Sequence, residues 1–317
     1  MATDTSNKRQ TIIDDDEDDE LDLVKLVATN ANDSNQYLVF EGSNGELYAK
    51  NVSKIEELLI YKDLVISKNS DSNQIILGTA DIRGQMTTIV NFDRWAGHDV
   101  LEESEYELLI IASYGDRRFA LVVKKVEQIT TIEPEDMTDN SSDNDKASFI
   151  TKVTISGVER LCTIFDGDKM LLDIYDDQKT LSDAAIKNMH EHISSEKYVV
   201  FADDSKFIRK MLSSLCDKLK IKNKIYADGK ELVENLKNIN IDDIGLIVTD
   251  IEMPQMGGRE VIDHIRKNSQ YDDINIIVHT NMTNNLMSNE LISAGTSKII
   301  GKVDMEELSL GIKEFMR

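Results

Sequence analysis

The sequence predicts a multidomain protein, with an all-β part followed by an α/β part built on a doubly wound parallel sheet. Residues 21–180 contain many short β-rich runs separated by Gly, Asn and Asp, and such tight turns favour an antiparallel barrel or sandwich. From residue 197 onward, apolar strand runs alternate with amphipathic helical segments, which is the pattern of a parallel sheet. The length of 317 residues is typical of about two domains.

Composition and charge exclude several classes of protein. Asp and Glu number 59 against 36 Lys and Arg, and the net charge of −23 argues against a nucleic-acid partner. No apolar run approaches the roughly 18 residues that span a membrane, and the polar N-terminus lacks the apolar core of a signal peptide. Cys162 and Cys216 lack the spacing of a disulfide framework or a zinc site, so we expect reduced thiols in a cytoplasmic protein.

Two polar segments flank the all-β part. Residues 1–20 end in the acidic run Asp14–Glu20, and like charges at this density repel one another, so we expect a disordered acidic tail. Residues 181–196 are predicted to be a helical linker, because Leu181, Ala184 and Ala185 recur near helical spacing in a polar stretch.

The all-β part, residues 21–180, is defined by strand runs and by the turns between them. Turn sequences such as Gly42-Ser43-Asn44-Gly45 and Asp166-Gly167-Asp168 tolerate the positive φ of tight hairpins. The predicted strands are Gln36–Phe40, Leu47–Val52, Ile75–Leu77, Thr87–Val90, Leu108–Ala112, Phe119–Val123, Arg160–Ile164 and Met170–Ile174.

The α/β part, residues 197–317, alternates strands with helices. Ser205 is a predicted helix N-cap, and the apolar residues that follow it recur with a period near 3.6. The predicted strands are Tyr198–Ala202, Lys224–Ala227, Leu246–Asp250, Asn275–Thr280 and Ser297–Ile300, and a helix is expected after each of them.

Chemically distinctive side chains follow the buried strands at their carboxyl ends, where ligands of parallel sheets gather. They are Asp203, Asp204, Asp250, Thr280 and Lys302. Three carboxylates at one site need a counter-ion, and Mg²⁺ prefers oxygen ligands of this kind. An aspartate can take a phosphoryl group as an acyl phosphate, while an ammonium and a hydroxyl contact its oxygens. We therefore predict Asp250 as a phosphoacceptor, with Thr280 and Lys302 as phosphate contacts.

These five residues and the Asp-x-x-Met-Pro-x-Met-Gly-Gly stretch at 250–258 resemble the response-regulator receiver family. The resemblance implies a flavodoxin-like fold of strand order 2-1-3-4-5. It also implies that Mg²⁺ binds the acidic pair, the acceptor and the backbone carbonyl of Glu252. Asn281 follows Thr280, where the family usually has a small residue. Ile299 and Val303 stand where an aromatic residue and a proline are common.

Four segments of the all-β part resemble CheW-like coupling domains. They are Tyr48–Leu58, Ile76–Gln85, Phe119–Ile129 and Leu171–Ile174, the last corresponding to the closing strand of the family. The resemblance implies paired five-stranded SH3-like barrels. It also makes Arg83 and Gly84 candidates for partner binding, because the Arg-Gly pair of these domains lies near their partner surfaces.

The order of the two parts is similar to that of the CheV family of chemotaxis proteins. This resemblance implies a cytoplasmic scaffold, associated with membrane chemoreceptor arrays, that couples chemoreceptor cytoplasmic tips to the histidine kinase CheA. Phosphorylation of Asp250 would modulate the coupling and give adaptation. The protein would be a phosphoacceptor rather than an enzyme, although a receiver domain assists its own Mg²⁺-dependent phosphorylation and dephosphorylation.

Two other functions remain open at this point. In the first, the protein is a phosphate sink that drains phosphoryl groups from the kinase. In the second, it is a Mg²⁺-dependent phosphatase of the haloacid-dehalogenase type, although Glu252 stands where that class has its second aspartate. A DNA-binding regulator is excluded, because no helix-turn-helix follows the receiver-like part and the charge is strongly negative.

Overall fold

A computed structural model describes residues 35–68, 75–114, 117–139, 146–174, 195–281, 285–302 and 304–316. The predicted acidic tail and residues 181–194 of the predicted helical linker lie outside these residues, as does Val303, and Ser195 and Glu196 are not helical. The chain divides into two compact units. The first contains most residues up to Ile164, and the second contains Phe165–Arg317 with the short segments 114–117 and 139–148.

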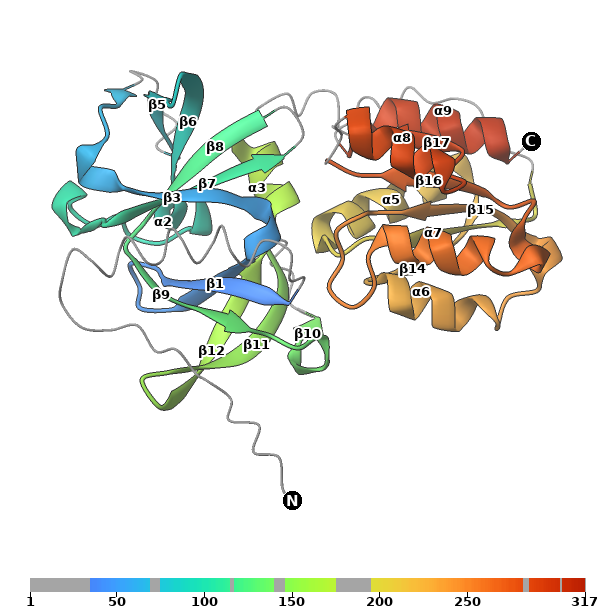
Figure 1. The fold of residues 1–317 in the computed structure, drawn as a ribbon, viewed down its shortest axis with the longest axis horizontal. Helices are drawn as coiled ribbons and strands as arrows, with labels where there is room; N and C mark the ends of the chain where they lie inside the picture. The colour runs from blue at the N-terminus through green and yellow to red at the C-terminus, as the bar shows by residue number, and fades with distance from the viewer. Residues whose placement is uncertain are drawn as a thin grey trace. The chain divides into compact units, whose positions relative to one another are not determined.

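The first unit is all-β, as the sequence predicts (Figure 1). One sheet has the order β10 (Thr138–Asp139), β11 (Ala147–Ile155), β12 (Val158–Phe165), β2 (Leu47–Asn51), β1 (Gln36–Glu41) and β9 (Lys125–Thr131). The other has the order β3 (Ile55–Ile60), β7 (Leu108–Tyr114), β8 (Arg117–Val123), β6 (Gln85–Asn91), β5 (Ile76–Ile82) and β4 (Ser67–Lys68). Each sheet thus consists of five longer strands and a two-residue edge strand, β10 or β4.

The core of the first unit is aromatic and aliphatic. Phe92 and Trp95 of the short helix α2 (Phe92–Ala96) are buried, and the Phe92 ring packs edge-on against Phe40 with centroids 4.8 Å apart. Burial alternates along Thr151–Ile155 of β11, where every second side chain faces the core, as expected for a strand. Val158 and Leu161 of β12 are exposed.

The second unit contains a five-stranded parallel sheet. Its order is β14 (Lys222–Tyr226), β13 (Tyr198–Ala202), β15 (Ile244–Thr249), β16 (Asn275–His279) and β17 (Lys298–Ile300), which is the expected order 2-1-3-4-5. The helices that alternate with the strands are α5 (Lys206–Leu219), α6 (Gly229–Leu236), α7 (Gly258–Arg266), α8 (Asn285–Ser293) and α9 (Met305–Phe315).

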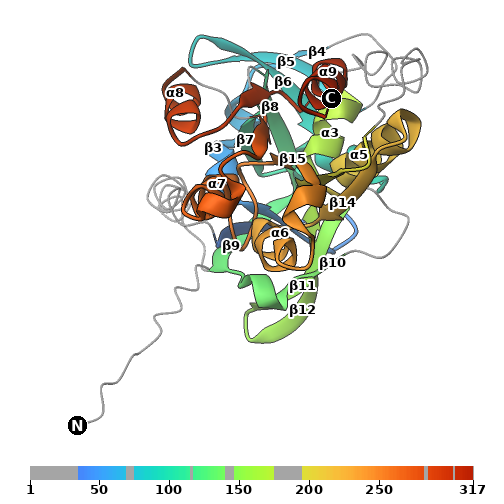
Figure 2. The same cartoon turned by 90° about the vertical axis from the view of Figure 1, so that its right-hand side faces the viewer.

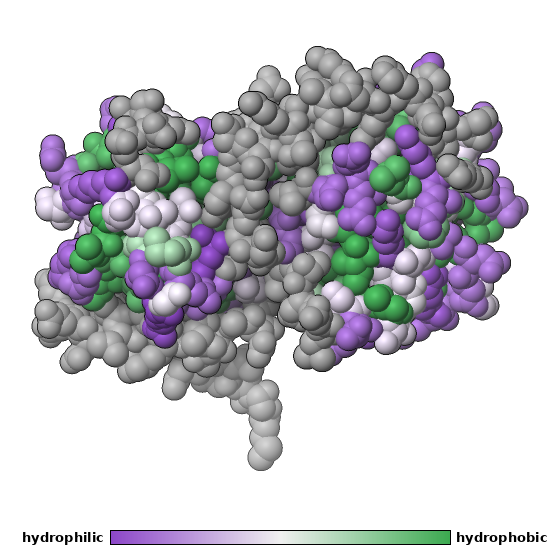
Figure 3. Space-filling model, turned by 90° about the horizontal axis from the view of Figure 1, so that it is seen from above, coloured by the Kyte–Doolittle hydropathy of each residue, from purple (hydrophilic) through white to green (hydrophobic). Residues whose placement is uncertain are grey.

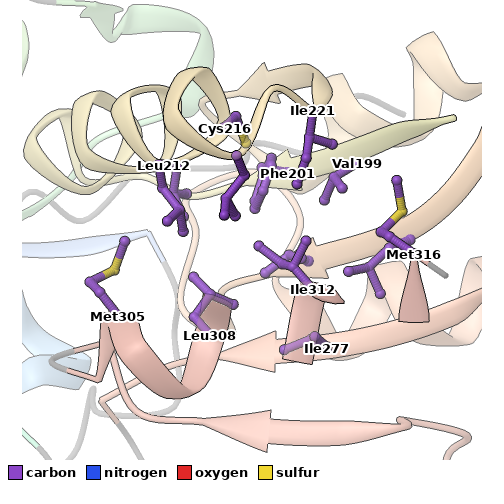
Figure 4. Packing of buried hydrophobic residues seen from close by; sticks show 14 of the residues in the cluster. Val199, Phe201, Leu212, Cys216, Ile221, Ile277, Met305, Leu308, Ile312 and Met316 are labelled. Atoms are coloured by element: carbon purple, nitrogen blue, oxygen red, sulfur yellow. The ribbon is translucent and has the colours of Figure 1, made fainter. Parts of the chain in front are cut away.

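Helices cover both faces of this sheet, and each face has its own apolar cluster. Side chains of α5 and α9 pack on one face, where Leu212 and Cys216 point toward Leu308 and Ile312 beside Phe201 (Figure 4). Side chains of α6 and α7 pack on the other face, together with Leu291 of α8. Because both faces are buried, the central strands β13, β15 and β16 are mostly apolar along their length rather than alternating, whereas the edge strand β14 keeps polar side chains.

The prediction of a strand at Met170–Ile174 is wrong. These residues lie in the helix α3 (Gly167–Ile174), which belongs to the second unit and contacts α5 (Figure 2). Asp166 caps this helix by accepting a hydrogen bond from the Lys169 N–H at 3.0 Å, and the run that follows lacks β-branched residues until Ile174. A short apolar run fits either period, and the cap favours the helix.

Exposed large apolar side chains are scattered among polar ones. The space-filling view shows apolar areas separated by hydrophilic side chains (Figure 3). Among the described residues, those most exposed include Val65, Met86, Leu161, Ile292 and Leu310. No helix in the described part of the chain has the length and apolar character needed to cross a membrane.

Candidate functional site

The carboxyl edge of the parallel sheet brings together the side chains that follow β13, β15 and β17. Residues Ala202 and Thr249 pair across β13 and β15, so the next residues, Asp203 and Asp250, leave the sheet side by side. The Asp250 N–H continues the ladder by donating to the Ala202 carbonyl at 2.9 Å. Lys302 follows β17 and reaches the same edge.

The Lys302 ammonium is the centre of this cluster. Its Nζ donates to Asp250 Oδ2 at 2.8 Å, to Asp203 Oδ1 at 3.1 Å and to Asp168 Oδ2 at 3.0 Å. All four side chains are buried, and Lys302 is 3% exposed. Hydrogen bonds between charged groups are stronger than neutral ones, and here the low dielectric of the interior adds to them.

The Met-Pro-x-Met-Gly-Gly stretch holds the acceptor loop against the next helix. A Cβ on Gly258 would lie 2.0 Å from the Asp250 carbonyl oxygen, so any other residue would push the loop away from α7. The Gly258 N–H donates to the Ile251 carbonyl at 2.9 Å, and the Ile251 N–H donates to Asp250 Oδ1 at 2.7 Å. These contacts fix the direction of the Asp250 carboxylate.

The electrostatics of the cluster favour an additional cation. Burial raises the pKa of Asp203 well above its ordinary value; the Lys302 ammonium acts to lower this pKa, and the carboxylates of Asp250 and Asp168 raise it further. Burial alone would lower the pKa of Lys302, but the carboxylates, led by Asp168, raise it well above its usual range. Three carboxylates share one ammonium, so the cluster keeps an excess of negative charge.

The donor set fits a divalent cation such as Mg²⁺. Ligand oxygens of Asp168, Asp203 and Asp204 all lie within 4.8 Å of one another. Among the described residues, the buried Oδ2 of Asp203 has no hydrogen-bond partner, and leaving a carboxylate oxygen in that state is costly without a cation. Oxygen ligands from carboxylates are the preference of Mg²⁺.

The other predicted site residues belong to the loops that follow three of the strands, namely Asp204 after β13, Glu252 after β15 and Thr280 after β16. Thr280 is buried directly after β16, and its N–H donates to the Ile300 carbonyl at 3.0 Å. Asp204 follows Asp203, and its carbonyl accepts a hydrogen bond from Arg209 Nη1 at 2.9 Å. Glu252 is half-buried, two residues beyond Asp250.

Sequence reasoning missed two aspartates of the site. Asp168 contacts Lys302 as described, and its Oδ1 accepts a hydrogen bond from Asn281 Nδ2 at 2.6 Å. Asp166 accepts hydrogen bonds from the Ser205 hydroxyl at 2.9 Å and from the Phe207 N–H at 3.3 Å. In the sequence both residues belong to an Asp-Gly-Asp turn pattern, and no local signal connects that pattern with the receiver-like part.

A buried histidine borders the cluster. His279 ends β16 and is 1% exposed, and neither of its ring nitrogens has a hydrogen-bond partner within the described part of the chain. Burial, aided by the nearby Lys302 ammonium, lowers the pKa of His279 to about 3. The imidazole is therefore neutral and packs as an apolar group.

We expect His279→Leu to make the stability of the protein less sensitive to acid. The unfolded histidine binds a proton near its ordinary pKa of 6.5, whereas the folded one binds none until about pH 3. Its contribution to stability is thus present above pH 6.5 and is lost as the pH falls toward 3, at up to about 1.4 kcal/mol per pH unit. Urea unfolding from about pH 7 to about pH 5 measures this.

The matched control is His264→Leu, at an exposed histidine of α7. As the pH falls, the free energy of unfolding of His279→Leu should rise relative to that of the wild type. The free energy of unfolding of the control should not rise relative to the wild type. A difference between His279→Leu and wild type that stays constant with pH contradicts the assignment of a buried neutral histidine.

In the first unit, Arg83 and Gly84 form the two-residue turn between β5 and β6. Both have positive φ, 54° and 80°, as a type I′ hairpin turn requires. Arg83 Nη2 lies 2.7 Å from Glu57 Oε2, and the Arg83 side chain is 72% exposed. Glu57 also accepts a hydrogen bond from Arg118 Nη2 at 3.0 Å, so the exposed guanidinium is held over a fixed carboxylate.

Comparisons with known proteins match two families to the chain. The model of the CheW-like domain matches residues 36–174, and the model of the response regulator receiver domain matches residues 199–313. The helix α3 lies within the first of these stretches.

Individual relatives cover nearly the full chain. Chemotaxis protein CheV2 of Helicobacter pylori is 26% identical over 281 residues, which is 83% of this chain and 88% of that protein. Chemotaxis protein CheV1 of the same organism is 26% identical over 316 residues, 92% of this chain and 96% of that one. Among solved structures, the CheY4 chemotaxis protein of Vibrio cholerae is 25% identical with a TM-score of 0.36, covering 38% of this chain and 99% of that chain.

Proposed function

We propose that the chain is a signalling adaptor in chemotaxis that joins a CheW-like domain to a response regulator receiver domain. In this role it couples chemoreceptors to the histidine kinase CheA, and phosphorylation of Asp250 modulates the coupling. The observation that carries the proposal is the buried contact of Lys302 Nζ with Asp250 Oδ2 at 2.8 Å, beside Asp203. A carboxylate fixed at a sheet edge against an ammonium is suited to accept a phosphoryl group.

In the proposed transfer, a carboxylate oxygen of Asp250 attacks the phosphorus of a phosphohistidine on the kinase. A new P–O bond forms, the P–N bond breaks, and its electron pair stays on the donor imidazole. Lys302 then contacts an oxygen of the phosphoryl group, and the Thr280 hydroxyl donates to another. Burial strengthens these interactions because water does not screen them.

Mg²⁺, when bound, neutralises charge on the phosphoryl oxygens during transfer. The residues that would hold it are Asp203, Asp204, Asp250 and the backbone carbonyl of Glu252. The neighbouring oxygens of Asp203 and Asp204 and the unpartnered Asp203 Oδ2 support this assignment. The same arrangement would serve loss of the phosphoryl group to water, so the lifetime of the phosphorylated state is set at this site.

Each segment of the chain has its own part in this function. Residues 21–180 form the coupling domain, residues 197–317 the receiver domain, residues 181–196 a helical linker and residues 1–20 an acidic tail. Arg83 and Gly84 lie on the partner surface, which the exposed guanidinium of Arg83 supports. The protein acts in the cytoplasm at membrane chemoreceptor arrays.

Reconstituted arrays test the coupling role. Full-length protein, chemoreceptor cytoplasmic fragments and CheA should give receptor-dependent kinase activity, and Arg83→Asn should weaken it by about tenfold, as expected for loss of an exposed arginine anchor. Asparagine tolerates the positive φ at this position, so the turn is kept. The measurement is the rate of CheA autophosphorylation.

Arg94→Asn, at another exposed arginine of the first unit, is the matched control and should retain full coupling. If the wild-type protein gives no receptor-dependent activity but still accepts phosphate from CheA, the scaffold proposal fails and the phosphate-sink alternative replaces it. Equal coupling by the wild type and Arg83→Asn would remove Arg83 from the partner surface.

A further inference from the structure

Asp168 binds hydrogen-bond donors that lie beside the predicted phosphoacceptor Asp250. Its two carboxylate oxygens accept hydrogen bonds from Lys302 Nζ at 3.0 Å and from Asn281 Nδ2 at 2.6 Å. Lys302 contacts the phosphoacceptor, and Asn281 directly follows Thr280. The carboxylate of Asp168 is therefore bound by an ammonium and an amide from the two loops that border the acceptor.

The helix that carries Asp168 is fixed to the second unit by shared capping. Asp166 caps α3 through the Lys169 N–H, and it also accepts hydrogen bonds from Ser205 and Phe207 at the start of α5. The Lys169 ammonium lies over the Phe207 ring, 5.4 Å from its centroid. One buried aspartate thus joins the N-termini of two helices, and this places Asp168 at the acceptor site.

We propose that Asp168 is an internal competitor of the phosphoryl group, so that α3 docks on the receiver when Asp250 is unmodified and is released when Asp250 is phosphorylated. The proposal rests on the proposed function of Asp250. It adds a regulatory contact between the acceptor site and a helix that lies within the stretch matched by the CheW-like domain.

Electrostatic repulsion opposes the binding of Asp168 to Lys302 when Asp250 is phosphorylated. A phosphoryl group adds about −1.5 to −2 charges at Asp250, and Asp168 already shares the Lys302 ammonium with Asp250. Lys302 already serves three carboxylates, and a phosphoryl group on Asp250 adds charge beside Asp168 that this single ammonium does not offset, so the two anions repel strongly in a low dielectric. The covalent group has the higher charge, so it retains Lys302 and Asp168 leaves.

Release of Asp168 would transmit phosphorylation of Asp250 to the first unit through the covalent link between α3 and β12. The helix α3 follows β12 with one intervening residue, Asp166, so a change at the acceptor site is passed along the chain to β12, which pairs with β11 and β2 inside its sheet. This route does not need an aromatic residue at position 299, where the chain has Ile299.

The test measures phosphorylation of the full-length protein by acetyl phosphate with Mg²⁺, which requires no kinase contact. We expect Asp168→Asn and Asp168→Ala to be phosphorylated at least on the order of tenfold faster than the wild type, because a competing charge is removed. In the wild type, phosphorylation should increase hydrogen exchange in residues 167–174, whereas Asp250→Asn treated in the same way should show no increase.

The matched control is Asp173→Asn, which removes a carboxylate from the same helix and whose ion pair is with Lys169. Its phosphorylation rate should equal that of the wild type, and circular dichroism should show that all variants are folded. Equal or slower phosphorylation of Asp168→Asn overturns the proposal, and a raised Mg²⁺ requirement in that variant would make Asp168 a metal ligand instead. Unchanged exchange in 167–174 on phosphorylation also overturns it.

If no variant and no wild-type sample is phosphorylated, the proposed function of Asp250 fails and the competition fails with it. If the wild type is phosphorylated but Asp168 has no effect on the rate, the proposed function stands and the competition alone is rejected. The two failures therefore give different results in the same experiment.

Discussion

Asp250→Asn will take up no phosphoryl label above background from phosphorylated CheA, whereas the wild-type protein will be labelled in the presence of Mg²⁺. The amide lacks the nucleophilic oxygen pair of the carboxylate, so the acyl phosphate cannot form. Chelation of Mg²⁺ should abolish labelling of the wild type as well, because the excess negative charge of the cluster would then repel the phosphoryl group. The measurement is transfer of radioactive phosphate from the kinase, followed over time.

The control for this substitution is Asp263→Asn. Asp263 is half exposed on α7 and pairs with Arg259 on its own helix, so the same chemical change is made outside the cluster. Its labelling should equal that of the wild type. Persistent label on Asp250→Asn would show that another residue accepts the phosphoryl group and would remove the basis of the proposed function.

Lys302→Met will lower the free energy of unfolding by about 3–5 kcal/mol when Mg²⁺ is chelated. The substitution keeps the volume of the side chain but leaves Asp168, Asp203 and Asp250 buried without their shared cation. The loss should be largest near neutral pH and should shrink as the pH falls, because protonation of the carboxylates relieves their repulsion. Urea unfolding at several pH values measures both effects.

Lys298→Met is the control for this second prediction. Lys298 Nζ lies 3.3 Å from Glu307 Oε1, but both side chains are partly exposed, so the pair should contribute only about 0–1 kcal/mol. An equal and small effect of the two substitutions would contradict the view that the Lys302 ammonium holds the three carboxylates together.

Much of the second unit was predictable because its strands are buried on both faces. A continuous apolar run that ends in a polar residue indicates both the strand and the edge at which it ends, as at Leu246–Asp250. The boundaries were less accurate. The second strand was predicted as Lys224–Ala227 but spans Lys222–Tyr226, because its edge position leaves polar side chains within it.

The first unit was predicted less completely. The strand β11, which begins at Ala147 shortly after a stretch rich in Asp and Asn, was not predicted, and Met170–Ile174 of α3 were assigned to a strand. In both cases the local pattern was ambiguous. Pairing with β12 selects the strand in one case, and capping by Asp166 selects the helix in the other.

By itself, the sequence determined the two-part fold, the strand order implied by the receiver resemblance, and the loops that carry Asp203, Asp250 and Lys302. It could do so because strand period and buried runs are local properties, and because parallel strands bring their carboxyl ends to one edge. Only the tertiary structure decided that Asp168 shares Lys302 with Asp250. These partners lie 134 residues apart, and the contact depends on how α3 is capped against α5, a relation between distant segments that no local pattern records.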